Sequence, residues 1–133
     1  MHTKPRVLLV DADLDFLQTM QPVLEENGFE LLSAYSAREG WEMVVYEQPD
    51  MIIMEVMLER HDSGFVLARA IKSDPRYKHI PILFLTDVAE KTGFEFDTGK
   101  DGYWMKADDF LKKSMPMPDL VSRINQLLEE EAV

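Results

Sequence analysis

Short apolar runs that end in polar residues, separated by stretches with helical spacing, constrain the fold of this chain more than any other feature. Most of these runs are almost continuously apolar, as expected for strands that are buried on both faces of a parallel sheet. Their alternation with helices predicts a doubly wound α/β domain. Five strands are predicted, over residues 6–10, 29–34, 51–57, 80–85 and 108–111.

The segments that follow the runs carry signals for helix ends. The first helical pattern ends at Gly28, because glycine readily adopts the backbone conformation found just after a helix. Ser36 and Glu39 have the spacing of a capping box and predict the start of a second helix. A third helix must end before Pro75, and Pro118 is suited to start the last one.

Composition narrows the class of function. The 133 residues fit a single domain over 1–133, and the apolar run near the amino terminus is too short for a signal peptide or a membrane span, so we expect a cytoplasmic protein. The chain has no cysteine and 3 histidines, of which His61 and His79 are expected on the surface. Its net charge of −11 would repel a nucleic-acid backbone. We therefore expect neither nucleic-acid nor membrane binding.

Doubly wound sheets carry their functional sites beyond the carboxyl ends of the strands, near the point where the strand order reverses. Polar residues stand at several of these positions in the sequence. They are Asp11 to Asp13 after the first strand, Glu55 in the third, Thr86 after the fourth and Lys113 after the fifth. These residues are the candidates for a site.

Four segments, in this order and spacing, resemble the receiver domains of two-component response regulators: VLLVDAD, PDMIIMEVML, IKSDPRYKHIPILFLTD and ADDFLKKS. The resemblance covers nearly the whole chain. It implies a flavodoxin-like, five-stranded parallel sheet of order 2-1-3-4-5 with helices on both faces. It also implies a module for phosphorelay signal transduction that binds other proteins and turns over no small substrate. The implied partners are a sensor histidine kinase or a downstream output protein, and a homodimer remains open.

The resemblance assigns roles by position. A receiver has a carboxylate that accepts a phosphoryl group, an acidic pair for magnesium, a hydroxyl and an aromatic residue that switch conformation, and a lysine. The corresponding residues are Glu55 for the acceptor, Asp11 and Ala12 for the acidic pair, Thr86 and Phe110 for the switch, and Lys113 for the lysine.

Two of these positions depart from the family pattern. Glu55 replaces an aspartate and carries its carboxylate one methylene further, where about 1 Å of misplacement can cost roughly a hundredfold in rate. Ala12 removes one oxygen ligand of a magnesium ion, and Asp13 could replace it only if the backbone shifted. We therefore predict a pseudo-receiver that works without phosphorylation and needs no cofactor. Magnesium binding through Asp11, Glu55 and the backbone of Met57 is expected to be weak or absent.

Several interpretations stay open. Glu55 could reach Thr86 and Lys113 and stand in for a phosphorylated aspartate, or it could form only a structural ion pair with Lys113. Alternatively, Glu55 or Asp11 could accept a phosphoryl group at an unusual site. A fourth interpretation, a flavodoxin-like module for a small anionic ligand, is disfavoured because no glycine-rich phosphate loop follows the first strand.

Residues 91–106 depart from the family pattern as well. Their glycines and aspartates disfavour a helix, so an irregular segment is predicted where receivers carry their fourth helix. Residues 97–102, with Asp108, resemble part of a calcium-binding loop, but a glycine-rich turn is the simpler interpretation. The aromatic residues in this region are expected to pack on the sheet edge rather than form a docking patch: Phe94, Phe96, Tyr103 and Trp104.

Overall fold

A computed structural model describes residues 4–86 and 109–132 of the chain. These residues contain a five-stranded parallel sheet in the order β2-β1-β3-β4-β5, which confirms the predicted fold class. The strands are β1 (Arg6–Val10), β2 (Glu30–Ala34), β3 (Met51–Met54), β4 (Ile82–Thr86) and β5 (Asp109–Lys112).

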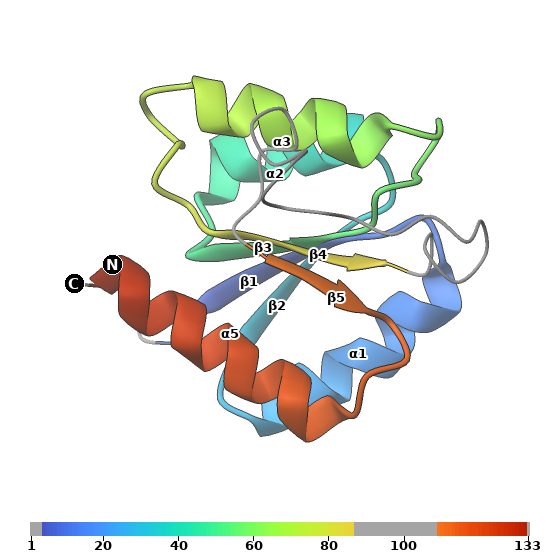
Figure 1. Cartoon of the computed structure of the whole chain (residues 1–133), viewed down its shortest axis with the longest axis vertical. Coiled ribbons are helices and arrows are strands. Elements are labelled where there is room, and N and C mark those ends of the chain that lie inside the picture. Colours follow the sequence, from blue (N-terminus) through green and yellow to red (C-terminus); the bar gives the residue numbers. More distant parts are fainter. Residues whose placement is uncertain (1–3, 87–108, 133) are drawn as a thin grey trace.

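Helices cover both faces of the sheet. Figure 1 shows α1 and α5 on one face and α2 and α3 on the other. The bounds of these helices are Leu14–Glu26 for α1, Ala37–Glu47 for α2, Ser63–Ser73 for α3 and Met117–Ala132 for α5. The predictions for residues 91–106, including the lost helix, the calcium-like loop and the aromatic residues, fall outside the part of the chain that the structure describes.

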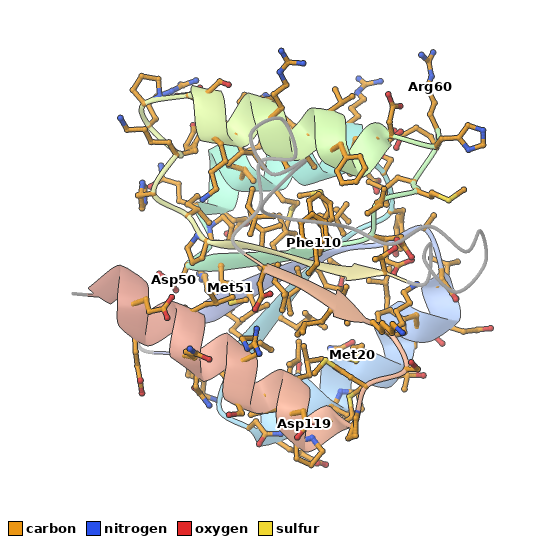
Figure 2. All side chains as sticks on the ribbon, in the orientation of Figure 1. Met20, Asp50, Met51, Arg60, Phe110 and Asp119 are labelled. Carbon is orange, nitrogen blue, oxygen red and sulfur yellow. The ribbon has the colours of Figure 1, made fainter. Side chains whose placement is uncertain are left out.

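Side chains from each central strand enter two separate cores. On β3, Ile52 packs in the cluster that includes Ile71 of α3, whereas the next residue, Ile53, packs with Ile124 of α5. Figure 2 shows the same division, with Phe110 on the α2–α3 side of the sheet and Met20 on the α1–α5 side. Burial on both faces explains why these strands are almost continuously apolar.

Local signals define the helix ends as the sequence predicts. The Ser36 hydroxyl accepts a hydrogen bond from the Glu39 amide at 3.1 Å, and a Glu39 carboxylate oxygen accepts one from the Tyr35 amide at 2.7 Å. The bond to Ser36 is the first half of the predicted capping box, whereas the Glu39 side chain reaches the Tyr35 amide instead of the amide of the N-cap residue Ser36. Gly28 follows α1 with a φ of 91°, in the left-handed region that favours glycine.

Several strand ends differ from the prediction, and the largest differences are at the end of β3 and at the start of β4. β3 ends at Met54 rather than at residue 57, because the Val56 amide bonds to the Glu55 side chain and the Val56 carbonyl accepts from Gly64. β4 begins at Ile82 rather than at residue 80, since the Ile80 amide closes a turn onto Tyr77.

Within the described residues, no helix is both long and apolar enough to cross a bilayer.

Candidate functional site

Four of the predicted site residues meet at one edge of the sheet. Asp11 directly follows β1, Glu55 follows β3, Thr86 ends β4 and Lys113 follows β5. Because all the strands are parallel, their carboxyl ends lie at one edge of the sheet, where β1 ends in register with β3 and β4 with β5. Residues far apart in the sequence are thereby brought within contact distance.

The polar groups at this edge are buried. Asp11, Glu55 and Thr86 are 2%, 4% and 3% exposed, and the Lys113 side chain is 15% exposed. A buried charge is costly unless it is paired and hydrogen-bonded. The arrangement at this edge therefore depends on how the two carboxylates are neutralised.

Lys113 provides the positive charge for both carboxylates. Its Nζ lies 2.8 Å from Oδ2 of Asp11, an ion pair rather than an aligned hydrogen bond, and 3.4 Å from Oε1 of Glu55. The same nitrogen lies 4.5 Å from the centre of the Phe16 ring. The second Asp11 oxygen, Oδ1, accepts a hydrogen bond from the Asp13 amide at 2.9 Å.

The second oxygen of Glu55 has donors of its own. Oε2 accepts a hydrogen bond of 2.6 Å from the Val56 amide and another from the Thr86 hydroxyl. Each oxygen of Asp11 and Glu55 therefore faces an ammonium group or a hydrogen-bond donor of the chain itself. Hydrogen bonds to the charged form stabilise a buried carboxylate.

The predicted switch aromatic lies against the core. The Phe110 ring stacks on the Phe84 ring with centroids 5.2 Å apart and 16° between the ring planes. Phe65 of α3 meets Phe110 edge-on with centroids 6.5 Å apart. Phe110 thus points from β5 into the space between the sheet and α3 (Figure 2).

The sequence matches the response regulator receiver domain over residues 7–125. The chain belongs to this family. Receiver domains are in general signalling modules of two-component systems. The chain is therefore a receiver domain of two-component signalling, as the sequence predicts.

Curated relatives include regulators from several bacteria. Response regulator MprA of Mycobacterium leprae is 33% identical over 92% of this chain. The phosphate regulon transcriptional regulatory protein PhoB of Pseudomonas aeruginosa is 31% identical over 92%, and the DNA-binding dual master transcriptional regulator RpaA of Synechocystis is 29% identical over 93%. The chain spans 50%, 51% and 49% of these three relatives, respectively, so their full activities do not transfer to it.

Solved structures agree with the fold. The receiver domain of a signal transduction histidine kinase from Syntrophus aciditrophicus superposes with a TM-score of 0.78 at 26% identity, covering 95% of this chain and 91% of that one. A CheY-like receiver domain protein from Methanospirillum hungatei gives a TM-score of 0.80 at 20% identity, with 98% of each chain covered. The second likeness is evidence for the fold alone.

The acidic residues of this receiver do not fit the magnesium ion that the family implies. Ala12 has no ligand atom, and the Asp13 side chain caps α1 by accepting from the Phe16 amide at 3.1 Å. Among the described residues, no three His, Cys, Asp or Glu side chains are placed to hold a metal ion. Met57, whose backbone was the third predicted ligand, lies in the loop after β3. Asp11 and Glu55 already have Lys113 as their cation.

The start of α3 packs directly against the backbone of Glu55 and Val56, just after β3. The Gly64 amide donates to the Val56 carbonyl at 2.8 Å, and a β-carbon at Gly64 would lie 2.2 Å from the Glu55 carbonyl oxygen. Glycine therefore permits this close approach. The sequence analysis did not identify Gly64; its place at the end of the loop after Glu55 was the available signal.

Glu59 hydrogen-bonds the loop between β3 and α3 to the start of α2. Its carboxylate accepts from the Ala37 amide, with oxygens at 2.9 and 3.2 Å. Slight burial would by itself raise the pKa of Glu59, but hydrogen bonds, chiefly from the backbone of Ala37, outweigh it and hold the pKa below the ordinary 4.5. The loop between β3 and α3 is thus held near its middle by α2 and closed at its base by the Gly64–Val56 hydrogen bond.

Phe16 is a second residue that the sequence analysis did not assign to the site. It lies in the first turn of α1, and its side chain packs beside the α1–α5 core. Its ring also faces the Lys113 ammonium. The spacing showed which side of the helix Phe16 occupies, but the lysine comes from the opposite end of the sequence.

Proposed function

We propose that this receiver signals through protein–protein contacts without accepting a phosphoryl group. The hydrogen bond from the Thr86 hydroxyl to Glu55 carries the proposal, together with the Lys113 ammonium on the other Glu55 oxygen. A phosphoryl donor would have to displace these groups before it could reach the carboxylate. It would also meet a site in which Ala12 supplies no metal ligand.

The positions of Thr86 and Phe110 support one interpretation of Glu55. In active receivers, the family pattern implies that the hydroxyl donates to the phosphoryl group and that the aromatic residue lies inward. Here Thr86 donates to the glutamate carboxylate, and Phe110 stacks on Phe84. Glu55 therefore stands in for a phosphorylated aspartate and holds the switch inward. A purely structural ion pair between Glu55 and Lys113 would explain the position of the lysine, but not the Thr86 hydrogen bond or the inward Phe110 ring.

Intact-mass spectrometry after incubation with magnesium and a small-molecule phosphodonor tests this proposal. The native chain is expected to gain no phosphoryl group, whereas a variant with Ala12→Asp and Glu55→Asp is expected to gain one. The double variant restores the family's acceptor length and acidic pair, so it also controls for the donor. A phosphoryl group on the native chain would overturn the proposal.

A second experiment tests the held switch. Phe110 can be followed by ¹⁹F NMR in protein labelled with fluorophenylalanine, with Phe110→Leu used to assign its signal. In Glu55→Ala and Thr86→Val chains, the Phe110 signal is expected to move towards that of a solvent-exposed ring, because the carboxylate–hydroxyl bond is lost in both. An unchanged signal in both variants would mean that Phe110 lies inward for reasons of packing alone.

The partner in this proposal is a sensor histidine kinase or a downstream output protein. Leu14 at the start of α1 and Tyr35 after β2 are large apolar side chains, 53% and 51% exposed, and both follow the carboxyl ends of strands beside the site. The net charge of −11 disfavours direct binding to nucleic acid. Binding to such a partner should not depend on magnesium or a phosphodonor, and it should weaken in Glu55→Ala.

A further inference from the structure

We propose that the Lys113 ammonium is the resident cation of this site, that it excludes a divalent ion, and that Phe16 is the positioning residue that holds it there. The inference deepens the proposed function and rests on it, since Lys113 neutralises both carboxylates in a site where Ala12 supplies no further ligand for the ion on which phosphorylation depends. Its evidence is the arrangement of groups around one nitrogen atom.

Two carboxylates and one aromatic face surround Lys113 Nζ. The ammonium lies 2.8 Å from Asp11 and 3.4 Å from Glu55, the two acidic side chains that a metal ion in this site would use. The remaining oxygens of these carboxylates accept from the Asp13 and Val56 amides and from Thr86. A divalent ion would have to displace the lysine and rebuild this network with too few protein ligands.

Phe16 restricts the positions open to the lysine. Its ring centre lies 4.5 Å from Nζ, within the range in which the negative face of an aromatic ring attracts a cation. The Asp13 cap fixes the first turn of α1, because its side chain accepts from the Phe16 amide itself. The backbone of the cap also binds Asp11, so one short segment orients both the carboxylate and the ring.

The first test is a magnesium titration of the full chain followed by amide NMR, with sodium chloride added to a matched ionic strength as the control. The amides of Asp13 and Val56 report on the site because they donate to Asp11 and Glu55. The native chain is expected to show no saturable shift at either amide. Lys113→Met is expected to show one at both, because the carboxylates then lack a cation. A saturable shift at both amides of the native chain overturns the proposal.

The second test separates positioning by Phe16 from simple core packing. Limited acetylation is read by peptide mass spectrometry, with the exposed Lys4 as an internal reference. Phe16→Leu keeps an apolar side chain but removes the ring, so Lys113 should react about fivefold faster relative to Lys4. Phe16→Tyr keeps the ring and should match the native chain. Leu14→Ala, on the same helical turn, should also match it.

The outcomes distinguish this inference from the proposed function. Equal Lys113 reactivity in native and Phe16→Leu chains removes Phe16 from the proposal. A native magnesium shift without any gain of a phosphoryl group overturns the resident cation and leaves the proposed function standing. If Lys113→Met does not fold, the titration is made with Phe16→Leu, which is expected to show a weaker shift at the same amides, and the absence of a shift there counts against the proposal.

Discussion

At both ends of the sheet one cation neutralises two carboxylates, but the cluster at the carboxyl end is buried more deeply than the cluster at the amino end. At the carboxyl end, Lys113 lies between Asp11 and Glu55, whose side chains are 3% and 5% exposed. At the amino end, Arg6 lies 3.0 Å from Glu30 and 2.9 Å from Glu47, with side chains that are 48% and 40% exposed. Each end places one cation between two carboxylates from other elements.

The difference in depth changes what each cluster can do. Around Arg6, water screens the charges and can replace any lost partner, so the cluster contributes little to stability. Around Lys113, little water can replace a lost partner, and removing one group leaves a buried charge without compensation. At the buried carboxyl end, the position of each charged group therefore depends on all the others. The amino end is a surface ion-pair network in which the groups are less dependent on one another.

The largest expected effect comes from removing the buried cation. Lys113→Met should lower the free energy of unfolding by about 3–5 kcal/mol, the usual cost of breaking a buried ion pair on one side. Urea denaturation followed by circular dichroism measures the loss. A loss below about 1 kcal/mol would show that the two ends of the sheet are energetically alike.

The next effect sharpens the comparison through backbone packing at the carboxyl end. Gly64→Ala should destabilise the chain by about 1–3 kcal/mol, because the new β-carbon would meet the unyielding backbone of Glu55. Gly40→Ala is the matched control on α2: its closest contact, at 2.8 Å, is the movable end of the Leu67 side chain. Thermal unfolding should show the smaller loss for Gly40→Ala, and the reverse order would contradict this account of the start of α3.

A smaller effect is expected at the amino end. Arg6→Met should cost at most about 1 kcal/mol, and the loss should shrink as salt is added, because its partners Glu30 and Glu47 are exposed. Urea denaturation at low and high salt checks both statements. A loss as large as that of Lys113→Met would remove the contrast between the two ends.

The smallest effect concerns pH and the loop beside the site. The folded-state pKa of Glu59 lies below its ordinary 4.5, so its contribution is fully present above pH 4.5 and is lost as pH falls through the lower, folded-state pKa. After solvent screening, this contribution is below about 1 kcal/mol. Glu59→Gln should therefore reduce stability slightly at neutral pH and make no difference in strong acid. Stability curves of the two chains that stay parallel down to strong acid would contradict the assignment.

Much of the fold could be predicted from local signals. The apolar runs correspond to the five strands, and the helix N-cap at Ser36 and the glycine after α1 lie where the sequence placed them. The boundary errors at Met54 and Ile82 arise from hydrogen bonds to Glu55, Gly64 and Tyr77, which pattern alone does not reveal. The periodicity of a helix or strand involves residues that are close in sequence, so it is visible in the sequence itself.

The residues at the carboxyl ends of the strands could be located from the apolar runs alone, and parallel strands bring those ends to one edge of the sheet. The contacts that these residues make with one another follow from tertiary packing. The bond from Thr86 to Glu55, the contact of Phe16 with Lys113 and the close approach of Gly64 each join different elements. They depend on the depth and angle at which helices pack on the sheet, and no local pattern encodes those quantities.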